Sequence, residues 1–273
     1  FHPAETQFAV HDLAEAAAIQ QLESAWLPCC AHLTVSSPLI GYEYRRRYSL
    51  RLDPVAVLNV FPRREAPTAP PPDERRAKGP VRLYWFSQTL GADPGLETLI
   101  ELLARGGRPC SLHLRARSCP AHQNRLRQHA RTVGFGGQIE FLPFAPSSEL
   151  VRLAAEYDIG VALELNEPFN RELCLSNKVF TYLLGGLPLL LSATRAHRAI
   201  LPDLDAAACC IDLSDPRSAA ATLADWSGSE ATLHQARRAA WELGQTRYNW
   251  DVEQWRLVEA VQRGIEVEEP AAR

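Results

Sequence analysis

The sequence predicts an α/β protein with a doubly wound parallel sheet, preceded by a smaller amino-terminal part. From residue 81 onward, short apolar segments alternate with amphipathic segments of helical period. The loops between them are short, which is typical of parallel strands with helices on both faces. Of the 273 residues, 46% are apolar and 22% are charged, so the chain can bury a sizeable core.

The amino-terminal part, residues 1–62, is predicted to alternate helices and strands. Residues 14–26 are rich in alanine, with acidic and glutamine positions between, and favour a helix. Pro38 begins a second helix, which runs through an arginine-rich stretch. β-branched and apolar residues at 32–37 and 55–62 are typical of strands.

Residues 63–79 are rich in proline and charge and lack an apolar period, so we interpret them as a hinge or linker. The main domain, residues 80–245, follows, and residues 246–273 are predicted to form a terminal crossover helix and tail. Helices separate the strands predicted for the main domain, which are 81–87, 110–117, 139–144, 159–165, 187–192 and 207–213. Ligands of such sheets bind outside the carboxyl ends of the strands.

Bulk properties exclude several classes of protein. A net charge of −3 gives no electrostatic indication of nucleic-acid binding. The basic run Arg45-Arg46-Arg47 fits either a solvated helix face or a surface that meets anionic lipid or phosphate. The seven cysteines show no metal-ligand spacing, and no signal peptide or membrane-spanning run is present. We therefore expect reduced thiols and a cytoplasmic location, with the inner membrane face as an alternative.

The sequence contains no methionine and begins with Phe1. We therefore expect it to be a fragment of a longer protein.

The segment Ser176–Pro188, SNKVFTYLLGGLP, predicts a helix that begins after Ser176, ends at Gly185-Gly186 and leads into an apolar strand. The first N–H groups of a helix lack internal acceptors and lie at the positive end of the helix dipole. Ser176 is expected to cap one of them, while the N–H groups of Asn177 and Lys178 stay available to an anion such as a diphosphate. A plain serine cap beside a solvated lysine is the alternative explanation of this pattern.

Other phosphate, metal and nucleophile motifs are absent from the sequence. It has no G-x-G-x-x-G, G-x-x-x-x-G-K-[ST], H-E-x-x-H or G-x-S-x-G pattern. Asp203 and Asp205 form a D-x-D, but they follow Pro202 in a turn, and we predict no metal site.

Two runs, EFLPFAPSSELVRLAAEYDIGVALEL and LSNKVFTYLLGGLPLLLS, resemble the carboxyl-terminal half of the GT-B-fold glycosyltransferases, in particular the retaining GT4-type group. The stretch YWFSQTLGADPGLETLIELLA resembles the first strand, loop and helix of the same domain, and the resemblance extends from Glu23 to Val261. It implies a Rossmann-like donor-binding domain with a partial amino-terminal domain. The family pattern Asn-Lys-x-Phe-Glu-Tyr-hydrophobic-x-x-Gly-x-Pro matches at Asn177, Lys178, Phe180, Tyr182, Gly186 and Pro188, with threonine at 181.

The resemblance also implies a site. In the family, the diphosphate of a nucleotide-sugar donor lies against the amino end of this helix, without a metal or other cofactor. The implied catalytic residues are Lys178, Glu172 and Arg115. The implied donor-binding residues are Ser87, Gln88, Thr89, Glu164, Glu167, Ser176, Asn177, Lys178 and Thr181.

The sequence departs from the family at several of these positions. Thr181 stands where the family has the glutamate that binds the ribose diol, and Leu173 stands where it has the paired glutamate. Glu172, Glu167 or Glu164 is the expected substitute. Pro94 replaces a family cation in the first loop, and Arg115 is expected to compensate.

We therefore expect a glycosyltransferase that moves a sugar from a nucleotide-diphosphate donor to a saccharide or lipid-linked acceptor, with retention of configuration. Polysaccharide biosynthesis is the implied setting, and peripheral membrane association is an open alternative. A transferase-like binding or scaffold domain that has lost its catalytic carboxylates is a second hypothesis. A sugar-nucleotide epimerase of the same fold is a third.

Overall fold

Six parallel strands form the main sheet, in the order β5-β4-β3-β6-β7-β8. The computed structural model describes residues 13–70, 72, 79–91, 94–106, 108–165 and 169–268. The order runs outward from β3 in one direction and then from β6 in the other, which is the doubly wound arrangement that the sequence predicts. The strands are β3 (Val81–Leu90), β4 (Cys110–Ser118), β5 (Gln138–Leu142), β6 (Ile159–Ala162), β7 (Leu189–Ser192) and β8 (Ala208–Ile211).

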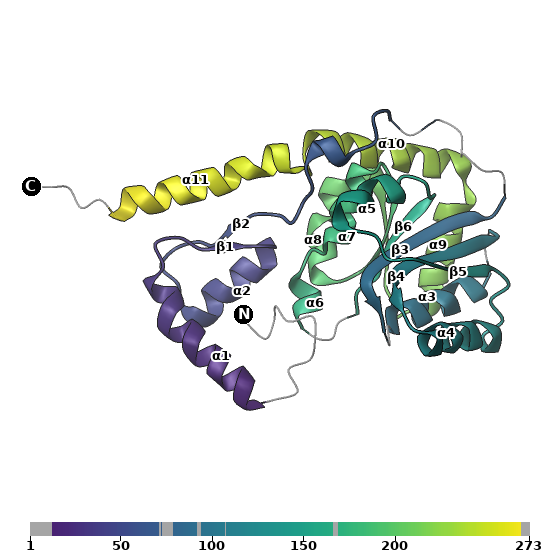
Figure 1. Ribbon diagram of the computed structural model, residues 1–273, viewed down its shortest axis with the longest axis horizontal. Coiled ribbons are helices and arrows are strands. Elements are labelled where there is room, and N and C mark those ends of the chain that lie inside the picture. The colour runs from purple at the N-terminus through teal and green to yellow at the C-terminus, as the bar shows by residue number, and fades with distance from the viewer. Residues whose placement is uncertain are drawn as a thin grey trace, which may run out of the picture.

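Helices cover both faces of this sheet and create two apolar cores (Figure 1). One face is covered by α3 (Pro94–Ala104), α4 (Pro120–Thr132) and α9 (Pro216–Gly228). The other is covered by α5 (Ser147–Ala154), α7 (Asn177–Leu184) and α8 (Arg195–Leu204). Helix α10 (Glu230–Thr246) contributes Leu233 to the first core and Ala240 to the second.

Several element boundaries differ from those predicted. Strand β3 continues through Thr89 and Leu90, because these residues pair with Arg117 and Ser118 of β4 after a bulge that follows Phe86. Pro146 occupies the N-cap position of α5, and no side chain caps this helix. A four-residue helix that the sequence did not predict, α6 (Asn170–Leu173), lies between β6 and α7.

The amino-terminal part contains α1 (Leu13–Trp26), β1 (Thr34–Val35), α2 (Pro38–Tyr48) and β2 (Val55–Ala56), with 3-10 turns at Leu27–Cys29 and Arg63–Glu65. The strands β1 and β2 pair in parallel and are much shorter than the predicted 32–37 and 55–62.

A third apolar cluster joins this part to α6. Val35, Ile40 and Tyr44 pack with Leu173, and the Ser37 hydroxyl donates a 2.6 Å hydrogen bond to the Leu173 carbonyl. The amino-terminal part therefore contacts the segment that precedes α7.

The last helix, α11 (Trp250–Glu268), extends away from the sheet toward β1 and β2 (Figure 1). Its first turn is bound to the predicted hinge and to the segment just before it. Trp250 N–H donates to the Phe61 carbonyl at 2.9 Å, and Arg63 N–H donates to Asp251 Oδ2 at 2.8 Å. One turn later, buried Glu253 accepts from Leu58 N–H at 2.8 Å.

No helix in the described ranges combines the length and the apolar character that crossing a bilayer requires. The seven cysteines are all free thiols.

Candidate functional site

The carboxyl edge of the sheet brings the predicted residues of β6, β7 and α7 together. Glu164 comes two residues after the end of β6, and its backbone N–H donates to the Ser192 hydroxyl at 2.8 Å. Ser192 is the last residue of β7, so this bond ties the loop after β6 to the neighbouring strand. The backbone of Glu164 is thereby held at the sheet edge while its side chain stays free to find partners.

Packing of α7 against the sheet places the amino end of that helix at the same edge. Phe180 and Tyr182 are fully buried. The Tyr182 hydroxyl lies 3.1 Å from the Val161 carbonyl and 3.2 Å from the Tyr84 carbonyl, so its proton is shared between two strands. Gly160 on β6 leaves room for the Tyr182 ring, because any Cβ there would overlap it. Gly186 ends the helix in the left-handed region, with φ of 66°.

The amino end of α7 is not capped by a side chain, so the prediction that Ser176 caps it is wrong. Ser176 has extended backbone angles, but its buried Oγ makes no hydrogen bond within the described part of the chain. Among the same residues, the N–H groups of Asn177 and Lys178 have no protein acceptor. The first turn therefore offers free N–H donors at the positive end of the helix dipole.

Two cations lie beside this helix end and share one carboxylate. Lys178 Nζ lies 3.3 Å from Glu164 Oε1, and Arg171 Nε lies 4.0 Å from Glu164 Oε2. Burial alone would raise the pKa of the Glu164 carboxyl, but the charges of Lys178 and Arg171 outweigh it and hold that pKa below its usual value. Glu164 is therefore ionised at neutral pH.

His197 of α8 lies close to this cluster and is fully buried. Burial lowers the pKa of its imidazole, so the ring is neutral at neutral pH. Its Nδ1 lies 2.8 Å from the Ser192 carbonyl, which can only accept, so Nδ1 carries the proton and Nε2 is an acceptor. His197 Nε2 and the buried Asn170 Oδ1 have no hydrogen-bond partner within the described ranges.

Sequence reasoning missed three residues of this region, namely Asn170, Arg171 and His197. They belong to α6 and α8, which contact each other, and Arg171 and His197 are close enough to Glu164 to lower the pKa of its carboxyl. No spacing or motif in the sequence relates residue 197 to residue 164, so no sequence signal was available for it.

The residues predicted at the end of β3 do lie at this edge. Ser87 is half-buried, and Gln88 and Thr89 are exposed. They belong to the strand rather than to a loop, after the bulge in its pairing. The ring of Trp85, on the same strand, has its centroid 5.9 Å from Lys178 Nζ, so β3 and the amino end of α7 are neighbours.

Three other predicted residues have different surroundings. Arg115 is buried, and it donates to the Tyr84 hydroxyl and to the Pro143 carbonyl, both at 2.9 Å. The Glu172 carboxylate accepts from Arg195 N–H at 2.9 Å, at the start of α8. Thr181 is fully buried, and its hydroxyl donates back to the Asn177 carbonyl of its own helix at 2.9 Å. Glu167 lies outside the described residues.

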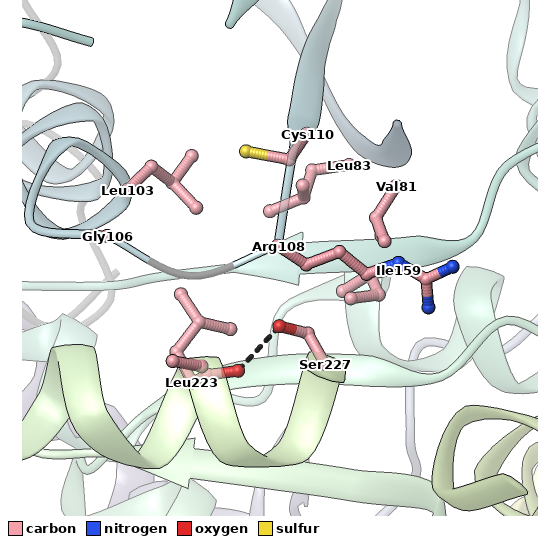
Figure 2. A pocket seen from close by; sticks show the side chains of 10 residues that line it. Val81, Leu83, Leu103, Gly106, Arg108, Cys110, Ile159, Leu223 and Ser227 are labelled. Atoms are coloured by element: carbon pink, nitrogen blue, oxygen red, sulfur yellow. Dashed lines mark hydrogen bonds between the residues drawn. The ribbon is translucent and has the colours of Figure 1, made fainter. Parts of the chain in front are cut away.

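A small cavity at the opposite, amino edge of the sheet is lined by Val81, Cys110 and Ile159, the first residues of their strands (Figure 2). Its volume is about 20 Å³, close to the room that one water molecule needs. Burial raises the pKa of the Cys110 thiol to about 11, which keeps the thiol protonated and unreactive. This cavity is too small for a substrate.

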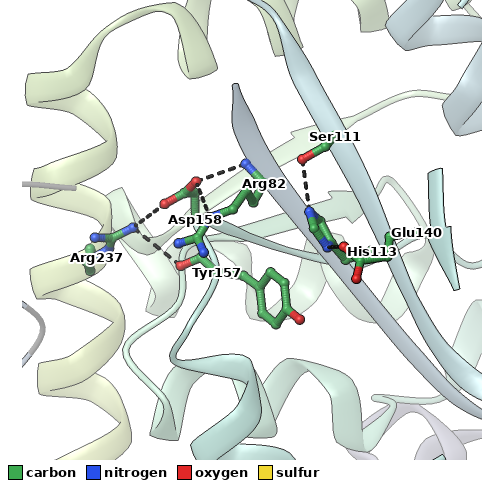
Figure 3. Close-up of polar contacts among 7 residues, drawn as sticks. All are labelled: Arg82, Ser111, His113, Glu140, Tyr157, Asp158 and Arg237. Atoms are coloured by element: carbon green, nitrogen blue, oxygen red, sulfur yellow. Dashed lines mark hydrogen bonds and ion pairs between the residues drawn. The ribbon is translucent and has the colours of Figure 1, made fainter. Parts of the chain in front are cut away.

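A second polar cluster lies on the face of β4 and β5 (Figure 3). Ser111 Oγ is 2.9 Å from His113 Nε2, and His113 Nδ1 is 3.0 Å from Glu140 Oε2. The order resembles that of a nucleophile, a base and an acid. However, β4 pairs with strands on both sides, so the backbone N–H groups near Ser111 are engaged in the sheet and cannot stabilise an oxyanion. We interpret this cluster as structural.

The residues at the carboxyl edge can therefore bind a compact polyanion. Free N–H groups of α7, the ammonium of Lys178 and the guanidinium of Arg171 converge there. The described residues contain no group of three or more histidines, cysteines or carboxylates that could hold a metal ion. Asp203, of the D-x-D, pairs with Arg247 at 2.7 Å.

Comparison with known proteins supports the fold. No protein-family model and no curated protein sequence match the chain. Sucrose-phosphate synthase from Thermosynechococcus elongatus superposes with a TM-score of 0.73 at 14% identity, over 97% of this chain and 66% of that one. HepE from Anabaena, solved with UDP and glucose, superposes with a TM-score of 0.70 at 13% identity, over 92% of this chain and 68% of that one. A glycosyltransferase from Rickettsia africae superposes with a TM-score of 0.67 at 10% identity, over 91% of this chain and 67% of that one.

The chain thus spans about two thirds of the length of these structures. At such low identity the likeness concerns the fold alone. The chain has the α/β Rossmann-like fold of the GT-B glycosyltransferases.

Proposed function

We propose that this chain is the donor-binding part of a glycosyltransferase. It transfers a sugar from a nucleotide-diphosphate donor to a saccharide or lipid-linked acceptor in the cytoplasm or at the inner membrane face, with retention of configuration. One observation carries the proposal: the uncapped amino end of α7 lies beside Lys178 and Arg171, at the carboxyl edge of a GT-B sheet. HepE, which shares this fold, was solved with UDP, with UDP and glucose, and with UDP-glucose.

The chemistry of the reaction explains why such a helix end is useful. As the glycosidic bond of the donor breaks, negative charge grows on the departing nucleoside diphosphate. Fixed N–H donors in a partly buried site, with cations beside them, stabilise that charge. The α7 N–H groups, Lys178 and Arg171 would act in this way, and they would do so without a metal.

A nucleoside diphosphate is therefore expected to stabilise the fold. At a ligand concentration of a hundred times Kd, the free energy of unfolding should rise by about 2.7 kcal/mol. A thermal-shift screen with UDP, GDP, ADP and their sugars measures this rise and identifies the nucleobase. If none of these ligands raises Tm, the proposed function is wrong.

The Lys178→Ala variant is expected to weaken binding of the stabilising nucleotide by about 1.5–3 kcal/mol, because a charge-assisted bond to the diphosphate is lost. This corresponds to roughly a 10- to 150-fold increase in Kd, measured by calorimetry. Arg125→Ala is the matched control, since it removes an exposed cation from α4 on the other face of the sheet. Equal affinities of Lys178→Ala and the unmodified chain would favour a plain helix start over an anion site.

A binding or scaffold domain is the second candidate, and the surroundings of Thr181 favour it. The position where the family has a ribose-binding glutamate holds a fully buried threonine, whose hydroxyl is bonded to its own helix. Hydrolysis of the sugar nucleotide that binds, or transfer of its sugar, separates an enzyme from a domain that only binds. Product analysis with a labelled sugar nucleotide would reveal an epimerase.

A further inference from the structure

The carboxylate of Glu164 lies where the proposed function places an anion of the substrate. It lies beside Lys178 Nζ at 3.3 Å and Arg171 Nε at 4.0 Å, the two cations nearest the uncapped end of α7. The three side chains are largely sheltered from solvent, with exposed fractions of 12% for Glu164, 16% for Lys178 and 27% for Arg171. Solvent therefore screens their attraction less than it would at an open surface.

The anchoring of Glu164 leaves its carboxylate free to change partner. The bond from its backbone N–H to Ser192 Oγ fixes the main chain, whereas Lys178 and Arg171 are the charged partners of the side chain within the described residues. When a diphosphate approaches the free N–H groups of Asn177 and Lys178, the ammonium of Lys178 is already paired with the Glu164 carboxylate. Two anions cannot share that ammonium without repelling each other.

We propose that Glu164 is a built-in competitor for the diphosphate site, which holds Lys178 in the free protein and is displaced from it when the donor binds. This inference rests on the proposed function and deepens it. Glu164 thereby lowers the affinity of the site for diphosphate, including the diphosphate product that must leave after transfer. Removing the Glu164 carboxylate should therefore increase the affinity for diphosphate, whereas removing a carboxylate that binds the donor directly would decrease the affinity for the donor.

The sign of the effect gives the test. Calorimetry measures the Kd for inorganic pyrophosphate, and for the nucleoside diphosphate that stabilises the chain, in the unmodified protein and in Glu164→Gln. The variant removes the competing charge and is expected to bind both ligands about fivefold more tightly. Glu149→Gln on α5 is the control, since its carboxylate is half exposed and pairs with Arg152 of the same helix. Its Kd values should not change.

Two further variants keep the inference testable if Glu164→Gln folds poorly. Glu164→Asp keeps the charge but withdraws it by one methylene group, so it should bind pyrophosphate with intermediate affinity. In a Lys178→Ala background, Glu164→Gln should tighten binding by a smaller factor than in the unmodified protein, because Arg171 is then the one cation of the described residues that the carboxylate and the ligand still share.

Weaker or unchanged pyrophosphate binding by Glu164→Gln would overturn the inference while the proposed function stands. Absence of any nucleotide or pyrophosphate binding, in all variants, would overturn both.

Discussion

The Asp158→Ala variant is expected to lose about 3–5 kcal/mol of its free energy of unfolding, the typical loss when one partner of a buried ion pair is removed. Asp158 is 1% exposed and directly precedes β6. Its Oδ2 accepts from Arg82 N–H at 2.9 Å and lies 3.4 Å from Arg82 Nε, while its Oδ1 lies 3.3 Å from a terminal nitrogen of Arg237 (Figure 3). Removing the carboxylate leaves the buried guanidinium of Arg237 without this partner.

Urea denaturation, followed by tryptophan fluorescence, measures this loss. Asp203→Ala is the matched control, because Asp203 also pairs with an arginine, but both Asp203 and Arg247 are 46% exposed. Exposed pairs contribute little, so the control should lose less than about 1 kcal/mol. If both variants lost the same free energy of unfolding, the buried Asp158 ion pairs would contribute no more to stability than an exposed pair.

The Gly160→Ala variant is expected to lose about 3 kcal/mol, at the upper end of the usual range for overpacking a core. A Cβ at this position on β6 would overlap the Tyr182 ring. That ring is fully buried, and its hydroxyl is fixed by the Val161 and Tyr84 carbonyls, so it has no space into which to move. Relief of the overlap would require α7 to shift away from the sheet.

Chemical denaturation of Gly160→Ala and Gly228→Ala distinguishes this effect from a general effect of adding a methyl group. A Cβ on Gly228, at the end of α9, has no heavy atom of the described residues within 4 Å, so that substitution should stay within about 0.5 kcal/mol. Because a shift of α7 also moves its amino end, Gly160→Ala should weaken nucleotide binding under conditions where it remains folded. Unchanged stability and affinity would contradict the close approach of Tyr182 to β6.

The sheet was predictable because its strands are short runs of buried apolar residues. Leu189, Leu190 and Leu191 are fully buried, and such runs are typical of parallel strands covered on both faces. The carboxyl edge was predictable for the same reason, since the strand order places Glu164 and Lys178 there. The position of Thr89 in β3 was not predictable, because its pairing with Arg117 depends on a bulge and on a distant segment.

The details of the site depend on packing that no local pattern encodes. Whether Ser176 caps α7 is decided by its backbone and side-chain angles, and residue type alone does not set these. His197 and Arg171 lie near Glu164 from α8 and α6, two helices that contact each other. Which carboxylate lies beside Lys178 likewise had to come from the structure, since the sequence offered Glu172, Glu167 or Glu164 only as substitutes for the missing family glutamate.

The bonds at the start of α11 have a mechanical consequence. Arg63, from the hinge, and Leu58 and Phe61, just before it, are bound to the start of the last helix. Two segments connect the amino-terminal part to the main domain, namely the hinge region and the start of α11. These hydrogen bonds hold the two segments together. Any movement of the amino-terminal part relative to the sheet would therefore have to move the start of α11 with it or break these bonds.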